Sequence, residues 1–146
     1  MKTALLDVNV LTALHWPAHE HHEAAHRWLA ERSTTRWATC PLTQLGFLRI
    51  VSNPSFSRDA LSPAEAITLL DTSRMHSRHE FWSDDIDVRD ALSGFEGRRQ
   101  GHKQVTDAYM LILATRHKGV LATFDRRLAP IAGRTFDSAL DIVPTR

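Results

Sequence analysis

The fold class follows from the stretch VTDAYMLILATRHKGVLATFD, which spans residues 105–125. Residues 105–118 are apolar on nearly every face and are followed by Gly119, which predicts a buried helix that stops at this glycine. Residues 120–124 form a short apolar run ending at Asp125, which predicts a buried strand. A buried helix that leads directly into a buried strand indicates a sheet covered by helices.

The rest of the chain repeats this alternation. Strands are predicted at residues 3–6, 36–40 and 80–82 and within 135–143, and helices at residues 8–14, 19–32, 41–51 and 62–75. In the helix at 41–51, Leu42, Leu45 and Leu48 are predicted to point inward. This alternation implies an α/β three-layer sandwich with a central parallel sheet, and a length of 146 residues suits a single domain, residues 1–146.

Composition narrows the class of protein further. Hydrophobic residues make up 42% of the chain and charged residues 24%, which is ordinary for a globular protein. Cys40 is the only cysteine, so no intramolecular disulfide can form and a reducing compartment is expected. No run approaches the roughly 18 apolar residues of a membrane span, and Asp7 and Asn9 interrupt the apolar N-terminus too early for a signal peptide. We therefore expect a cytoplasmic protein with no membrane association.

Three aspartates stand where a parallel α/β sheet places its active site, just beyond the carboxyl ends of the strands. Asp7 follows the first predicted strand, Asp125 follows the strand at 120–124, and Asp107 opens the long helix. Each residue alone also suits the capping of a helix N-terminus. If all three converge, a bound cation must offset their repulsion, and carboxylate oxygens select Mg²⁺, with Mn²⁺ as an alternative. Asn9, two residues after Asp7, is then expected to hold the substrate or a metal-bound water.

Four motifs resemble those of PIN-domain ribonucleases, and in particular the VapC toxins of VapBC toxin–antitoxin pairs. They are Leu6–Leu11 (LDVNVL), the block from Trp37 to Pro54, Gln104–Tyr109 (QVTDAY) and Ala122–Leu128 (ATFDRRL). The resemblance implies a Mg²⁺-dependent endoribonuclease that cleaves RNA with a metal-activated water. By position, Asp7, Asp107 and Asp125 would be the metal ligands and Thr123 an auxiliary group lining the site.

The sequence departs from the PIN pattern at the second acidic position, where the usual Glu is replaced by Gln44. Glutamine keeps a carbonyl oxygen but brings no negative charge, so the site has three formal charges instead of four. We expect Gln44 to lie near the metal. The departure leaves open an alternative, a catalytically impaired PIN-like domain that binds RNA or a protein partner.

The distribution of charged residues along the chain indicates which molecules the protein is expected to bind. Eight Lys and Arg residues occur between positions 98 and 134, against two acids, whereas the preceding segment is acidic. Arg98, Arg99, Lys103 and Arg126 are therefore expected to bind the RNA substrate, although a solvated helical face would look the same. An acidic pocket rimmed by basic residues would also accept an Arg or Lys of a VapB-like antitoxin. The resemblance further implies a homodimer.

Other signals compete with this reading. His22-Glu23-Ala24-Ala25-His26 matches the HExxH zinc motif, but the spacing offers no third ligand, and a His-rich solvated helix explains the segment. A metal-free ribonuclease using His102 and Lys103 as acid and base lacks a clear second histidine. Four aromatic residues, Trp16, Phe56, Trp82 and Phe95, suit either stacking on bases or core packing.

Overall fold

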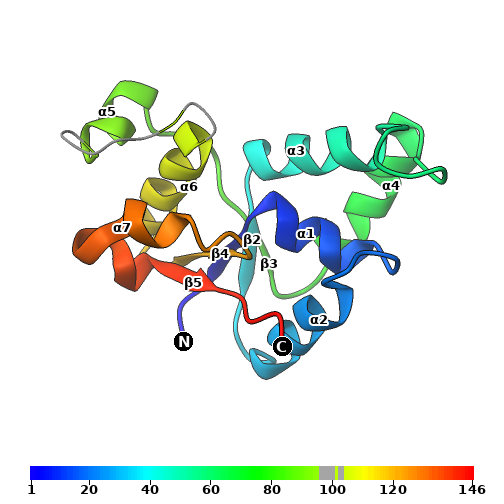
Figure 1. Cartoon of the computed structure of the whole chain (residues 1–146), viewed down its shortest axis with the longest axis horizontal. Helices are drawn as coiled ribbons and strands as arrows, with labels where there is room; N and C mark the ends of the chain where they lie inside the picture. The colour runs from blue at the N-terminus through cyan, green and yellow to red at the C-terminus, as the bar shows by residue number, and fades with distance from the viewer. Residues whose placement is uncertain (96–100, 102–103) are drawn as a thin grey trace.

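The computed structural model of the chain describes residues 1–95, 101 and 104–146. Within those residues five strands form one sheet: β1 (Ala4–Leu6), β2 (Trp37–Thr39), β3 (His79–Phe81), β4 (Val120–Thr123) and β5 (Leu140–Ile142). The strand order is β3-β2-β1-β4-β5, and every neighbouring pair is parallel. The predicted parallel sheet is confirmed (Figure 1).

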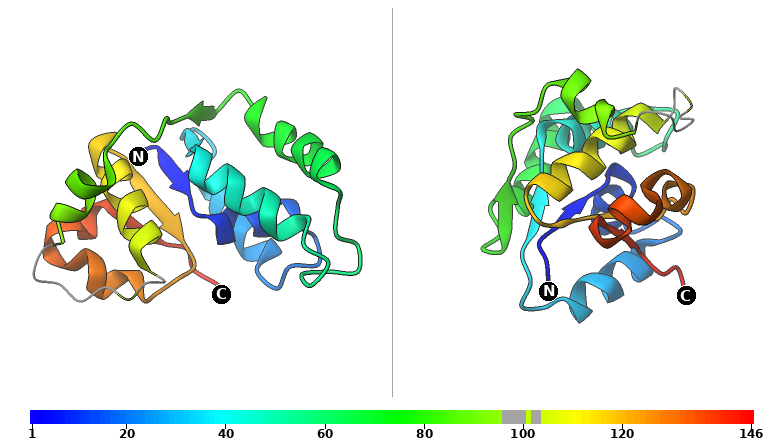
Figure 2. Two further views of the ribbon diagram at one scale, coloured as in Figure 1. Left: turned by 90° about the horizontal axis from the view of Figure 1, so that it is seen from above. Right: turned by 90° about the vertical axis from the view of Figure 1, so that its left-hand side faces the viewer.

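Helices cover both faces of this sheet. They are α1 (Val8–His15), α2 (His22–Glu31), α3 (Pro41–Val51), α4 (Pro63–Arg74), α5 (Val88–Ser93), α6 (Val105–Arg116) and α7 (Leu128–Phe136). Seen from above, α1, α3 and α4 lie on one side of the sheet and α5, α6 and α7 on the other (Figure 2). The expected three-layer sandwich is therefore confirmed. None of the described helices has the length and apolarity to span a bilayer.

Successive side chains of the central strands pack into two separate hydrophobic clusters, one on each face of the sheet. In β1, Leu5 packs into the cluster beneath α5, α6 and α7, whereas Ala4 and Leu6 pack into the cluster beneath α1 to α4. In β4, Leu121 and Ala122 divide between the same two clusters. Successive side chains of a strand point to opposite faces, so short, wholly apolar strands are what a sheet buried on both faces requires.

The helix start signals operate as the sequence suggests. The Ser62 hydroxyl accepts a hydrogen bond from the Glu65 backbone N–H at 3.2 Å, and the Glu65 carboxylate accepts one from the Ser62 N–H at 3.0 Å. This reciprocal capping box, followed by Pro63 in the first turn, fixes the start of α4. The Asp7 side chain caps α1 more simply, by accepting the Val8 N–H, so the strand β1 passes directly into a helix.

The inward face predicted for α3 is wrong at Leu45, whereas Leu42 and Leu48 are partly buried against the two core clusters as expected. Thr43, Phe47 and Val51 are buried, whereas Leu45 is 58% exposed. The cause lies at the first turn, where the Thr43 hydroxyl accepts a hydrogen bond from the Cys40 N–H at 3.0 Å and so turns Thr43 toward the sheet. Positions 43, 47 and 51 then follow at the i, i+4 spacing of one helix face.

Candidate metal and nucleic-acid site

The pairing of β1 with β4 brings the first site residues together. Leu6 lies opposite Ala122, and the Asp7 backbone N–H donates to the Ala122 carbonyl at 2.9 Å. The residues after these strands therefore meet at one edge of the sheet, where the Thr123 hydroxyl donates to Asp7 Oδ2 at 2.6 Å. The other carboxylate oxygen, Oδ1, accepts the Val8 N–H at 2.7 Å.

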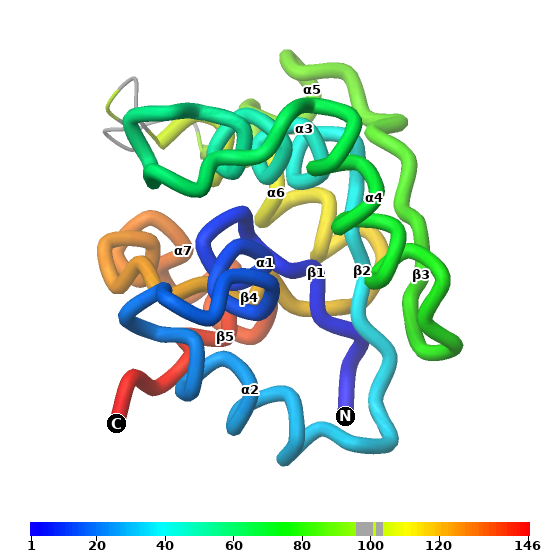
Figure 3. The backbone as a smooth tube through the Cα atoms, turned by 90° about the vertical axis from the view of Figure 1, so that its right-hand side faces the viewer, coloured from blue at the N-terminus to red at the C-terminus, as the bar shows by residue number. Residues whose placement is uncertain are grey.

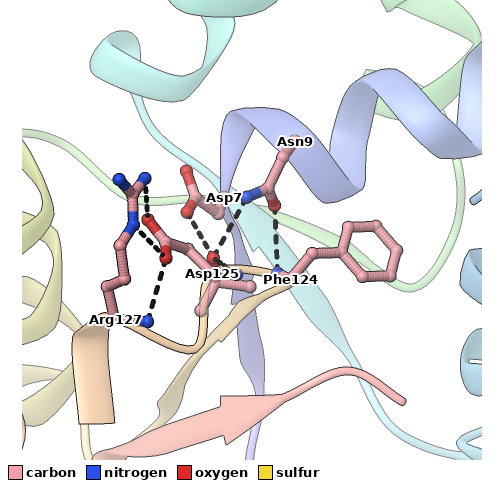
Figure 4. Close-up of polar contacts among 6 residues, drawn as sticks. Asp7, Asn9, Phe124, Asp125 and Arg127 are labelled. Carbon is pink, nitrogen blue, oxygen red and sulfur yellow. Dashed lines mark hydrogen bonds and ion pairs between the residues drawn. The ribbon is translucent and has the colours of Figure 1, made fainter. Parts of the chain in front are cut away.

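Thr123 is the centre of a small hydrogen-bond network. Its Oγ1 accepts from the Asn9 side-chain amide at 3.2 Å and from the Asp125 backbone N–H at 3.1 Å. The Asn9 Oδ1 in turn accepts the Phe124 N–H at 3.3 Å. Both ends of the Asn9 amide thus hold the turn after β4 in place, as Figure 4 shows, which is a positioning role.

Asp125 faces a cation of its own chain. The Arg127 guanidinium donates to both Asp125 oxygens, at 2.9 Å from Nε and 3.0 Å from Nη2, in a bidentate pair. This pairing lowers the pKa of Asp125 below its ordinary value. The sequence analysis did not single out Arg127, although an arginine two residues after an expected ligand, on the same turn, is a signal for such a pair.

Asp107 lies in the first turn of α6, on the face of the sheet opposite to α1 (Figure 2). Burial, together with the charges of Asp7 and Asp125, raises its pKa to about 7. The three carboxylates are therefore near enough for the charges of Asp7 and Asp125 to act on Asp107, and a shared metal site stays a prediction. Burial also raises the pKa of Asp7, which is 6% exposed.

The donor set fits a hard divalent cation. Asp7 and Asp107 form no ion pair with any residue of the described chain, although the charge of Arg127, beyond ion-pair distance, acts to lower the pKa of Asp107. Carboxylate oxygens of this kind suit Mg²⁺ or Mn²⁺. Among the described residues, however, no three acidic, histidine or cysteine side chains stand close enough to form a closed ligand set. Within the described chain, Asp125 is therefore the one carboxylate of the three that already pairs with a cation, Arg127.

The Gln44 side chain hydrogen-bonds elsewhere. Its Nε2 donates to the Thr39 hydroxyl at 3.0 Å, and Thr39 Oγ1 also hydrogen-bonds His79 Nε2 at 2.7 Å. These contacts tie the first turn of α3 to β2 and β3. The expectation that Gln44 lies near the metal stays a prediction.

The expected RNA-binding residues are only partly described. Arg126 is exposed and directly follows Asp125, at the rim of the site. Arg98, Arg99 and Lys103 lie outside the described residues, as does His102 of the metal-free alternative.

The histidines of the HExxH motif serve the fold. The His22 ring bonds the Ala13 carbonyl at 2.7 Å, and the His26 ring bonds the Leu14 carbonyl at 2.8 Å. These carbonyls belong to the last turn of α1, where backbone acceptors have no partner within the helix. The two imidazoles therefore cap α1, which agrees with a structural role for this segment. Of the four aromatic residues considered for stacking, Trp82 and Phe95 are buried in the core.

The structure therefore places aspartates at the carboxyl edge of the central strands of a parallel sheet that lies between two helical layers. The family model for the PIN domain matches residues 4–134, and the chain belongs to the PIN-domain family.

Curated relatives point to one branch of that family. Ribonuclease VapC39 of Mycobacterium tuberculosis is 45% identical over 130 residues, which cover 89% of this chain and 94% of that protein. Ribonuclease VapC44 of the same organism is 43% identical over 126 residues, covering 86% and 88%. Ribonuclease VapC38 is 40% identical over 129 residues, covering 88% and 89%. The resemblance to VapC toxins is thus confirmed.

Proposed function

We propose that this protein is a divalent-metal-dependent endoribonuclease that acts as the toxin of a type II toxin–antitoxin pair. The observation that carries the proposal is the buried Asp7 carboxylate, which shares its surroundings with Asp107 and Asp125 and has no counterion in the described chain. A site built in this way favours a bound cation, and the PIN-domain family and its VapC ribonucleases supply the matching chemistry.

Mg²⁺ is the proposed cation, with Mn²⁺ as the alternative, and Asp7, Asp107 and Asp125 are the residues that would hold it. When bound, such a cation activates water and stabilises the charge that develops on phosphate. The chain itself positions the carboxylates. Thr123 fixes the orientation of Asp7, Asn9 holds the turn that carries Asp125, and Arg126, with Arg98, Arg99 and Lys103, is proposed to bind the RNA backbone.

The proposed partners follow from the same site. A VapB-like antitoxin is expected to place an Arg or Lys among the carboxylates, in the way that Arg127 already pairs with Asp125. We further propose that the toxin is a cytoplasmic homodimer, in keeping with an intracellular RNA target and with a single cysteine.

The decisive experiment is cleavage of mixed cellular RNA by the purified protein after treatment with EDTA. We expect activity to disappear with EDTA and to return with Mg²⁺ or Mn²⁺. Asp7→Asn should lower the rate at least about a hundredfold, since the metal contributes several kcal/mol of transition-state stabilisation. Recovery with Zn²⁺ alone, or full activity of Asp7→Asn, would contradict the proposal.

A second candidate, a PIN-like domain that binds RNA or a partner without cleaving, is favoured by Gln44 and by the absence of a closed ligand set in the described chain. The same experiment separates the two. A protein that retains RNA in a binding assay with Mg²⁺, but releases no fragments over hours, is the non-catalytic form.

A further inference from the structure

A cavity of about 650 Å³ adjoins the carboxylate site. It lies between α1, α3 and the segment that follows α3, and its lining begins at Val8 and Asn9, the two residues directly after Asp7. Figure 3 shows α1 lying between α2 and α3. Its size is within the range of small-ligand pockets.

Gly46 explains how closely α3 approaches this region. A Cβ atom at Gly46 would lie 2.5 Å from Cγ2 of Val8, a contact that real side chains do not make. The glycine therefore allows the helices to come together around the cavity. Residues of both helices can then contact one ligand.

Two polar side chains of the lining, His19 and Asn53, present hydrogen-bond donors. His19 Nδ1 accepts the His21 backbone N–H at 3.0 Å, so the neutral ring carries its proton on Nε2. Asn53 Oδ1 accepts the Ser55 N–H at 3.0 Å, which leaves the Asn53 amide nitrogen to donate. None of the described lining residues is acidic. This arrangement suits a ligand rich in acceptor atoms.

Arg49 supplies a positive charge at the same place. It lines the cavity, is exposed, and forms no ion pair with an acid in the described part of the chain. An unpaired guanidinium beside a nuclease site is suited to bidentate contact with a phosphate.

The opposite part of the lining is apolar. Ile50 and Phe56 lie there, and Phe56 is held by an edge contact with Trp16 at a ring-centroid distance of 5.1 Å. An aromatic ring fixed in this way offers a surface on which a nucleobase can stack.

Thr12 adds an independent observation. It borders the cavity and is 2% exposed, yet its hydroxyl has no hydrogen-bond partner among the described residues. A buried hydroxyl without a partner costs free energy, and an acceptor of a bound ligand would supply what is missing.

We propose that this cavity binds one nucleotide of the RNA substrate adjacent to the scissile phosphate. The phosphate contacts Arg49, the base lies against Phe56 and Ile50, and acceptor atoms of the nucleotide meet the donors of His19, Asn53 and Thr12. This inference rests on the proposed ribonuclease function, and it adds a subsite on the side of the carboxylates away from α6.

The first test is binding of a short fluorescent single-stranded RNA, measured by anisotropy in EDTA so that cleavage does not interfere. Arg49→Gln should bind about tenfold more weakly, because a hydrogen bond to a charged group is lost. The slope of log affinity against log salt should fall by about 0.7, the value for one phosphate contact on a single strand. Arg27→Gln, an equal loss of charge on the exposed face of α2, is the matched control and should bind like the parent.

Thr12→Val separates binding from folding. Removing an unpaired buried hydroxyl should leave the melting temperature unchanged or raise it, while RNA affinity falls roughly three- to tenfold through the loss of one hydrogen bond.

The outcomes are distinct. If Arg49→Gln and Thr12→Val both bind RNA as Arg27→Gln does, the cavity is not a nucleotide subsite, and Mg²⁺-dependent cleavage by the parent would still stand. A parent that neither binds nor cleaves RNA would overturn the proposed function and this inference with it.

Discussion

Asp7 and Asp107 carry the same carboxyl group and face the same region, yet the protein holds them differently. Asp7 sits at the end of a central strand, is buried, and accepts hydrogen bonds from both Thr123 and Val8. Asp107 stands in the first turn of α6 and is half-buried. No hydrogen bond to its side chain is found among the described residues.

This difference separates two tasks. On the strand side of the site, hydrogen bonds from Thr123 and Val8 fix the Asp7 carboxylate before any cation binds, so the position of this carboxylate does not depend on the cation. On the helix side, the ionisation of Asp107 depends on burial and on neighbouring charges. We infer that the strand side of the site, Asp7 and Thr123, supplies rigidity, and that the helix side, Asp107, supplies sensitivity to cations and pH. Substitutions on the strand side should mainly change stability, whereas substitutions on the helix side should change how stability depends on pH and cations.

The largest effect on stability is expected at Thr123, the centre of the rigid side. Thr123→Val removes the donor to Asp7 and the acceptor of two further hydrogen bonds. Because buried polar groups are left without partners, the free energy of unfolding should fall by about 2–3 kcal/mol. Urea denaturation at pH 7 in EDTA measures this. Thr123→Ser keeps the hydroxyl and should lose less than half as much, and equal losses for Ser and Val would refute the role of the hydroxyl.

The next effect concerns Asp107 and pH. Its pKa is about 7 in the folded protein against 3.8 for the free group, so between these values the folded state binds more protons than the unfolded state. Stability of the metal-free protein should therefore fall as pH rises from about 4 to 7. Asp107→Asn should remove part of this fall and be more stable than the parent at pH 8, by on the order of 1–2 kcal/mol after allowance for solvent screening.

Thermal unfolding in EDTA at pH 4.5 and pH 8 measures the effect. The parent with saturating Mg²⁺ serves as the comparison, because a cation that neutralises Asp107 should flatten the same pH dependence. A metal-free parent whose stability does not change between these two pH values would contradict the assigned shift.

The sequence predicts where the site residues meet better than it predicts the hydrogen bonds that orient them. Thr123 ends a short apolar strand, and Asp7 and Asp125 follow such strands. Parallel pairing brings the carboxyl ends of these strands to one edge of the sheet, so the meeting of these residues was predictable. The roles of Asn9 and Arg127 were not, because they depend on side-chain hydrogen bonds across turns whose conformation no periodicity encodes. Asn9 was expected to hold substrate or water, but its amide bonds Thr123 and Phe124.

The helical layers show the same limit. The chain positions of α3 and α4 follow from Pro41 and the Ser62 capping box, whereas α7 was not predicted. It contains Pro130, and Gly133 interrupts it with a φ of 57°, so its sequence has the appearance of a loop. Helix α5 lies within an acidic segment and begins where the Asp87 side chain accepts the Arg89 N–H. In both cases packing against α6 overrides weak local preference.

A smaller effect is expected from Arg127, the internal cation of the site. Arg127→Gln removes the bidentate partner of Asp125 and frees its carboxylate for a divalent ion. The Arg127 side chain is 78% exposed, and exposed ion pairs are weak, so Mg²⁺ affinity should rise only about 1.5- to fivefold. Isothermal titration calorimetry measures it. Arg126→Gln is the control, because it removes a neighbouring cation that does not form this pair. A larger gain in Mg²⁺ affinity for Arg126→Gln than for Arg127→Gln would show that Arg126 is the residue that competes with the divalent ion.

The smallest effect is expected at Gln44, where the PIN pattern has an acid. The Gln44 amide donates to Thr39, whose hydroxyl also bonds His79, so its side chain is already committed to β2 and β3. In Gln44→Glu the Thr39 hydroxyl must turn to donate to the new carboxylate, and His79 must then donate to Thr39. Burial lowers the pKa of His79 in the parent, and the added charge should raise it.

If the Glu stays at Thr39, Mg²⁺ affinity should change by less than about twofold, since a charge beyond direct contact is largely screened. If it reaches the cation, a gain of about 1–2 kcal/mol should tighten binding roughly five- to thirtyfold. Titration of Mg²⁺ against Gln44→Glu and Gln44→Ala, with the His79 pKa followed by NMR, distinguishes these cases. We expect the small change and the raised pKa, and a fivefold or larger gain in affinity would place position 44 at the metal.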